Sequence, residues 1–162
     1  MHRSEPITIA ALMSRDVISV HPDSTLSEVA KIMAEHKFNG LPVVDESNLL
    51  VGIVTEYDLI SGSGMSLHLP TLQAVLSQLP VFGKDKSEFK ANIEEVTKLR
   101  VKDLMNKEPL TLTEDASYEE AVKTFQEHHR VNPIPIINMQ RQVVGVLSRF
   151  DILKPLNQAF LK

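Results

Sequence analysis

The chain has 162 residues, of which 43% are hydrophobic and 23% charged, and its formal net charge is −4. It contains no cysteine, which excludes disulfide frameworks, cysteine nucleophiles and thiolate zinc sites. No apolar run reaches the roughly 18 residues of a membrane span, and the first apolar stretch is too short and polar for a signal peptide. A mildly acidic chain has no long-range attraction to nucleic acid or anionic lipid. We therefore expect a cytoplasmic protein that binds neither nucleic acid nor membranes.

An internal repeat organises the sequence. Residues 12–60 match residues 104–153, first at a constant offset and, after one inserted residue, at an offset larger by one. The matched pairs include Leu12 with Leu104, Met13 with Met105, Glu28 with Glu120, Pro42 with Pro135, Gly52 with Gly145, and Asp58 with Asp151. Because so many matches occur at the same offset, the pattern indicates a duplicated structural unit.

The sequence of the first repeat predicts the order strand, helix, strand, strand, helix. Thr25 and Glu28 have the spacing of a capping box, which predicts a helix start. That helix should bury a stripe formed by Leu26, Val29, Ala30 and Met33. The expected strands are residues 18–20, 41–44 and 49–55, and a short helix should start at Thr55.

The segment between the repeats predicts a helical hairpin at about residues 67–99. Residues 61–64 read as a flexible joint, and Pro70 suits the first turn of a helix. A second helix is expected from about Ser87. The hairpin could cover the sheets or a dimer seam, or alternatively form a lid or partner surface.

The second repeat has the same expected order. Ser117 and Glu120 form its capping-box pattern, and Tyr118, Ala121, Val122 and Phe125 its buried helical stripe. The expected strands are residues 110–112, 134–137 and 143–148, and a short helix should start at Ser148.

These elements predict an α/β (α+β) chain of two β-α-β-β-α repeats. One repeat of about 50 residues hardly buries its own sheet, so the two sheets should pack together about a pseudo-two-fold axis with helices outside. The expected boundaries are residues 1–62 for the first repeat, 63–99 for the linker with its hairpin, and 100–162 for the second repeat.

The duplicated segments together resemble the cystathionine-beta-synthase (CBS) domain, and their tandem arrangement resembles a CBS pair, or Bateman module. The resemblance is carried by residues 12–20, 40–45 and 51–59, and by residues 103–105, 134–138 and 144–152 of the second copy. It implies two clefts between the repeats that bind adenosine-containing ligands, homodimerisation, and a ligand signal passed to a protein target. AMP, ADP, ATP and S-adenosylmethionine are the candidate ligands, and no cofactor is required.

The resemblance also implies which residues line the clefts. The first cleft would combine Ser148, Arg149 and Asp151 with Ser14, Ile18, Ser19, Asn39 and Gly40. The second would combine Thr55, Glu56 and Asp58 with Asn106, Leu110, Thr111, Asn132 and Pro133.

The Ser/Thr-x-x-Asp pattern at Thr55–Asp58 and Ser148–Asp151 has two interpretations. It is a capping box by itself, and a hydroxyl with a carboxylate at a helix start also suits a ribose diol and a nearby phosphate. Arg149 follows the first hydroxyl where Glu56 follows the other, so the two clefts are not equivalent. Each charge could equally be a solvated surface group. If one cleft alone is occupied, we expect the one with Arg149.

No motif in the chain is typical of an enzyme or a metal site. We therefore expect a regulatory ligand sensor without catalytic residues. The alternative is a structural or interaction module with degenerate clefts, suggested by asparagines at residues 39 and 132, where family members place Arg or His. Single-stranded nucleic acid binding is a third interpretation, but aromatic platforms and a basic groove are missing from the sequence.

Overall fold

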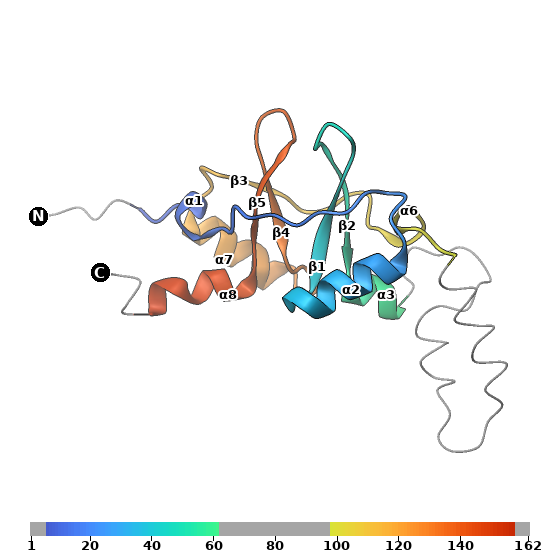
Figure 1. Cartoon of the computed structure of the whole chain (residues 1–162). Helices are drawn as coiled ribbons and strands as arrows, with labels where there is room; N and C mark the ends of the chain where they lie inside the picture. The colour runs from blue at the N-terminus through green and yellow to red at the C-terminus, as the bar shows by residue number, and fades with distance from the viewer. Residues whose placement is uncertain (1–5, 62–97, 158–162) are drawn as a thin grey trace, which may run out of the picture. The chain divides into compact units, whose positions relative to one another are not determined.

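A computed structural model describes residues 6–61 and 98–157 (Figure 1). The expected helical hairpin falls almost entirely in residues 62–97, outside the described part of the chain. Helices and strands are mixed along the chain, and the strands form two small sheets, as the sequence predicts. The chain divides into two compact units, which are described separately below.

Unit 1 contains the residues up to Ile18, Glu46–Leu50 and the chain from Pro109 on. Its helices are α1 (Ile9–Leu12), α7 (Tyr118–Glu127), α8 (Arg149–Leu153) and the 3-10 turn η1 (Lys154–Leu156). Its sheet has the order β3 (Leu112–Thr113), β4 (Ile134–Ile137) and β5 (Val143–Leu147). Strand β3 is parallel to β4, and β4 is antiparallel to β5 with Ile134 opposite Leu147.

Unit 2 contains residues 19–45, 51–61 and 98–108 of the described chain. Its helices are α2 (Leu26–His36), α3 (Glu56–Ser61) and α6 (Val101–Leu104). Its sheet pairs β1 (Gly40–Val44) with β2 (Leu50–Thr55). Figure 1 shows α2 and α3 beside this hairpin.

The expected order of elements is confirmed, with four local corrections. The expected strand at 18–20 reduces to one parallel bridge between Val20 and Val43, and the strand expected at 110–112 is Leu112–Thr113. Ala30 is exposed rather than part of the buried stripe. The Thr25–Glu28 capping box is complete, whereas at Ser117 only the hydroxyl accepts its bond from the Glu120 N–H.

The short helices α1 and α6 exchange places between the repeats. Helix α1 precedes the first repeat but donates backbone bonds from Ile9 to Ala116 and from Ala10 to Glu114. Helix α6 precedes the second repeat but donates from Val101 to Ser24 and from Lys102 to Pro22. Each compact unit is therefore built from segments that are far apart in the sequence.

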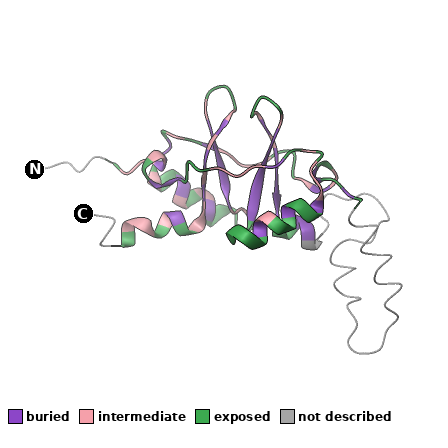
Figure 2. Cartoon of the chain, in the orientation of Figure 1, coloured by how far each residue is buried: buried purple, intermediate pink, exposed green. Residues whose placement is uncertain are grey.

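Each unit has its own aliphatic core. Figure 2 shows the strands of both hairpins as buried and α2 with one buried and one exposed face. In unit 1 the core includes Ile9, Leu12, Phe125, Ile136 and Leu147. In unit 2 it includes Val29, Leu41, Val54, Val101 and Leu104. Strands β1 and β4 are buried at every residue, which explains why these two apolar runs do not alternate with polar residues.

Two glycines allow a backbone segment to lie directly on each hairpin. A Cβ on Gly145 would lie 2.6 Å from the Met13 sulfur and 3.1 Å from the Ser14 carbonyl oxygen. A Cβ on Gly52 would lie 2.8 Å from the Met105 sulfur and 2.9 Å from the Asn106 carbonyl oxygen. The absent side chain lets Ser14 pair with Val146 and Asn106 with Ile53.

We expect Gly145→Ala to lower the free energy of unfolding by about 1–3 kcal/mol, because the methyl group overlaps Met13 and crowds the Ser14 backbone. Urea denaturation measures the change. Combining it with Met13→Ala should cost less than the sum of the two single substitutions, since the main overlap is then removed. Additive costs would contradict the contact.

Candidate functional site

The turn from β5 into α8 holds a closed hydroxyl–carboxylate box. The Ser148 N–H donates to Asp151 Oδ2 at 2.7 Å, and the Ser148 hydroxyl donates to the same oxygen at 3.0 Å. The Asp151 N–H donates back to the Ser148 hydroxyl at 3.3 Å. Asp151 is 9% exposed, so these bonds hold a largely buried carboxylate at the start of the helix.

The turn from β2 into α3 repeats this arrangement in unit 2. The Thr55 N–H and hydroxyl donate to Asp58 Oδ2 at 2.9 and 3.0 Å, and the Asp58 N–H donates to the hydroxyl at 3.4 Å. Both residues are buried, with Asp58 8% exposed. The capping interpretation of the Ser/Thr-x-x-Asp pattern is therefore confirmed at both positions.

Each box has a predicted site residue beside it on the neighbouring segment. Ser14 exchanges two backbone hydrogen bonds of 2.9 Å with Val146, two residues before Ser148. Asn106 exchanges equivalent bonds of 3.0 and 2.9 Å with Ile53, two residues before Thr55. The structure thus brings Ser14 to the Ser148 box and Asn106 to the Thr55 box, as the sequence grouping expected.

The two asparagines lie beside the opposite boxes from those expected. Asn132 accepts a 3.1 Å hydrogen bond from the Arg149 N–H through its side-chain oxygen. Asn39 accepts a 2.9 Å hydrogen bond from the Glu56 N–H through its backbone carbonyl oxygen. The reason is the antiparallel hairpin, which places the residue before its first strand next to the residue after its second. Gly40 and Pro133 follow these asparagines at the same strand starts and are buried.

The remaining predicted lining residues lie outside this hydrogen-bonded geometry. Ile18, Ser19, Leu110 and Thr111 are all partly exposed and lie directly before the Val20 bridge or strand β3. Their role in ligand binding stays a prediction from the resemblance.

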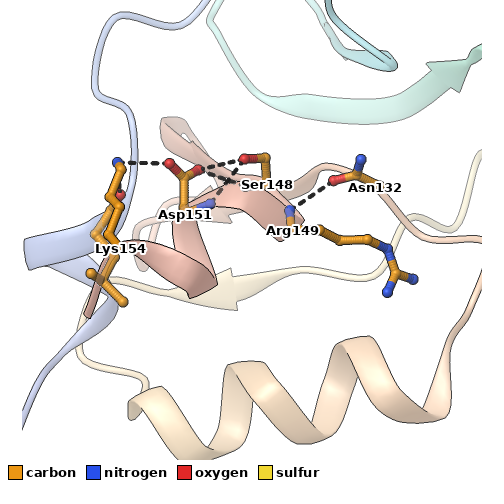
Figure 3. Close-up of polar contacts among 6 residues, drawn as sticks. Asn132, Ser148, Arg149, Asp151 and Lys154 are labelled. Carbon is orange, nitrogen blue, oxygen red and sulfur yellow. Dashed lines mark hydrogen bonds and ion pairs between the residues drawn. The ribbon is translucent and has the colours of Figure 1, made fainter. Parts of the chain in front are cut away.

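Arg149 does not extend toward the box. Its guanidinium donates to the carbonyl oxygens of Phe125, His128 and His129 at 3.4, 3.1 and 2.8 Å. It also lies 5.1 Å from the centre of the Phe125 ring. Figure 3 shows the side chain leading away from Asp151. The guanidinium caps the carbonyl end of α7, and the expectation that Arg149 lines a ligand cleft stays a prediction.

Lys154 is the cation at the Ser148 box, and the sequence analysis missed it. Its Nζ lies 2.7 Å from Asp151 Oδ1 and donates at 2.7 Å to the Leu12 carbonyl oxygen at the end of α1 (Figure 3). The spacing of three residues from Asp151, along a helical stretch, is the signal that indicates such a pair.

The bonds to Asp151 limit what a ligand can add. A carboxylate offers about four acceptor positions, and Ser148 and Lys154 occupy three of them. Roughly one position therefore remains for a further donor such as a sugar hydroxyl. In the described residues no group of three or more metal-ligating side chains occurs, and no helix there is long and apolar enough to cross a membrane.

Replacing Arg149 by alanine should lower the free energy of unfolding by about 1–2 kcal/mol, because three carbonyl bonds and the ring contact are lost. Thermal unfolding followed by circular dichroism measures this change. Arg15→Ala is the matched control, since Arg15 makes one exposed 3.7 Å ion pair with Glu114 and should cost under about 1 kcal/mol. Equal, small effects of both substitutions would contradict the capping role.

Comparison with known proteins gives the same repeat organisation. The CBS domain family matches residues 9–63 and 101–157. Inosine-5'-monophosphate dehydrogenase of Methanocaldococcus jannaschii is 33% identical over 86% of this chain, which spans 22% of that protein. The chloroplastic CBS domain-containing protein CBSX1 of Arabidopsis thaliana is 26% identical over 94% of this chain, which spans 65% of that protein.

Solved structures share the fold. CBSX2 of Arabidopsis thaliana in complex with AMP has a TM-score of 0.69 at 24% identity, covering 93% of this chain and 97% of that one. The CBS domain pair of protein MJ0100, in complex with 5'-methylthioadenosine and S-adenosyl-L-methionine, has a TM-score of 0.66 at 22% identity, covering 93% and 100%. With both repeats matched, the chain belongs to the CBS domain family as a tandem pair.

Proposed function

We propose that this CBS pair is a regulatory module that binds adenosine-containing ligands at its two hydroxyl–carboxylate boxes and reports their presence to a protein partner. The observation that carries the proposal is the duplicated box. Ser148–Asp151 and Thr55–Asp58 keep the same bonds at the same position of both repeats. A single box is explained by capping alone, whereas two copies beside paired segments supply one binding position in each repeat.

The chemistry of each box suits a nucleoside. Ribose hydroxyls donate hydrogen bonds, and a carboxylate is the strongest side-chain acceptor for them. Further polar residues lie beside each box, Ser14 and Asn132 at one and Asn106 and Asn39 at the other. The aliphatic strands beside them offer apolar surface for a flat base.

The relatives support the ligand class. Two solved CBS-pair structures of this fold are complexes with AMP, and with 5'-methylthioadenosine and S-adenosylmethionine. All three ligands carry adenosine, and they differ in the charge of the 5' substituent. We therefore propose an adenosyl compound as the ligand of this chain, and we expect the 5' group to decide which adenosyl compound is bound.

Other expectations from the sequence stay predictions. They are the absence of catalysis, the cytoplasmic location and a homodimer. One matched relative is a dehydrogenase, and the matched part is a minor share of that protein's length; another relative is chloroplastic.

Three large apolar side chains at the C-terminal end of unit 1, Phe150, Leu153 and Leu156, are 80%, 52% and 76% exposed, and a second copy is the occupant we propose for them.

Thermal unfolding of the full chain with adenosine, AMP, ADP, ATP, 5'-methylthioadenosine and S-adenosylmethionine tests the proposal. A ligand at a hundred times its dissociation constant adds about 2.7 kcal/mol to the free energy of unfolding. For this length the transition should rise by roughly 5–10 °C. The double variant Asp58→Asn/Asp151→Asn should lose the rise, because both ribose acceptors lose their charge.

Glu119→Gln is the control, since it removes one exposed charge in the first turn of α7 and away from either box. It should keep the wild-type response. A folded chain that responds to none of the six compounds would contradict ligand sensing and favour the interaction module with degenerate sites. A response that survives the double variant would place the ligand elsewhere.

A further inference from the structure

We propose that Lys154 couples ligand binding at the Ser148–Asp151 box to the docking of the N-terminal segment, defined as residues 7–14. Lys154 is a positioning residue. It orients the Asp151 carboxylate for a ribose hydroxyl, and the docked helix α1 keeps the lysine in place. A ligand at this box consequently holds the N-terminal segment more firmly on the second repeat. The inference rests on the proposed function and assigns a regulated segment to one of its two sites.

The link is an ammonium shared by two distant parts of the chain. Lys154 Nζ lies 2.7 Å from Asp151 Oδ1 and donates at 2.7 Å to the Leu12 carbonyl oxygen. Leu12 is the last residue of α1, and carbonyl groups in the last turn of a helix need partners from outside the helix. The lysine therefore serves a helix end and a carboxylate of the box at once, which ties the position of one to that of the other.

The Asp151 carboxylate is oriented by contacts on both of its oxygens. Oδ2 accepts the Ser148 N–H and hydroxyl at 2.7 and 3.0 Å, and Oδ1 lies against Lys154. Figure 3 shows the ammonium and Ser148 on opposite sides of the carboxylate. The terminal torsion of an aspartate is broad, so the contact at Oδ1 narrows the orientations open to this acceptor. A ligand hydroxyl then meets a preorganised group and spends less binding free energy on ordering it.

The N-terminal segment is docked on the second repeat through its backbone and two buried side chains. The Ile9 N–H donates to the Ala116 carbonyl at 3.0 Å, and the Ala10 N–H donates to the Glu114 carbonyl at 3.1 Å. The side chains of Ile9 and Leu12 are 0% exposed. Short peripheral segments open locally at a lower free energy than core strands do. A further charge-assisted bond to the end of α1 therefore changes how often this segment opens.

The coupling is reciprocal. Because the docked segment holds Lys154 and Lys154 orients Asp151, a ligand binds the docked state more tightly than the open one. By linkage, the ligand then favours the docked state by the same factor. The Lys154 side chain is 41% exposed, so solvent weakens the link, and one charge-assisted hydrogen bond there corresponds to a factor of about three to ten. The factor concerns the ribose contact, so an uncharged adenosyl ligand should show it as well.

A double-mutant cycle measured by titration calorimetry tests the coupling. The background is Asp58→Asn, which leaves the Ser148 box as the tested site. The probe is 5'-methylthioadenosine, which has no charge to attract the ammonium. Lys154→Met removes the link and should weaken binding by about three- to tenfold. Ile9→Ala loosens the segment and should weaken binding by up to the same factor. In the Lys154→Met chain, Ile9→Ala should have no further effect, because the loosening is no longer transmitted to Asp151.

Hydrogen exchange of the full chain tests the reverse direction. At saturating probe, the Ile9 and Ala10 amides should exchange about three- to tenfold more slowly than in the free chain. Lys154→Met should abolish this slowing at a probe concentration that still saturates the box. Lys102→Met is the matched control, since Lys102 makes a 2.7 Å ion pair with Asp23 in unit 2. It should keep both the slowing and the affinity.

The outcomes separate the inference from the proposal beneath it. Binding of neither 5'-methylthioadenosine nor AMP to the wild-type chain would overturn the proposed function and this inference with it, and AMP is the probe if it alone binds. Binding without slower exchange of the segment would overturn the inference alone. So would losses that multiply in the Ile9→Ala/Lys154→Met chain. Circular dichroism verifies folding, Ile9→Val replaces an alanine variant that does not fold, and the exchange measurement on the wild-type chain needs no substitution.

Discussion

The hydrogen-bonded box between a strand end and a helix start is the interaction on which both units depend. At Ser148 and at Thr55, the chain turns from a buried strand into a short helix, and one carboxylate oxygen holds the turn by accepting the backbone N–H and the hydroxyl. Helices of five and six residues are not stable by themselves in water. The box fixes their start, and the same polar groups are then available, in part, to a ligand.

The surroundings of the box depend on an exchange of segments. Helices α1 and α6 each pack in the unit built around the other repeat, and the residues that follow them lie on β5 and β2 at Gly145 and Gly52. This close approach brings Ser14 and Asn106 next to the boxes. Lys154 adds a link in unit 1, because one ammonium joins the carboxylate of the box to the end of α1.

The sequence predicts the parts whose signal is local. The run at 134–137 is a strand because it is continuously apolar, and Thr25 with Glu28 starts a helix because their spacing satisfies free N–H groups. Helix α1 has four residues and packs against residues more than 100 positions away, so no local pattern indicates it. Its place follows from tertiary packing alone.

The sequence placed part of the candidate site's local geometry correctly. Ser14 and Asn106 lie beside the expected boxes, whereas Asn39 and Asn132 are hydrogen-bonded beside the other box in each case, and the role of all four in ligand binding stays a prediction. The antiparallel hairpin rule would have corrected that grouping, since it joins residues 132 and 149. The direction of the Arg149 side chain was not predictable, because a guanidinium beside both a helix end and a turn can donate hydrogen bonds to acceptors at either place.

The measurement that tests the account most directly is amide chemical-shift mapping of the labelled chain during titration with AMP and with 5'-methylthioadenosine. The account predicts that the largest shifts fall at the amides that donate within the boxes, those of Ser148 and Asp151 or of Thr55 and Asp58. Saturable shifts elsewhere, with these four amides unchanged, would contradict the claim that the boxes bind the ligand.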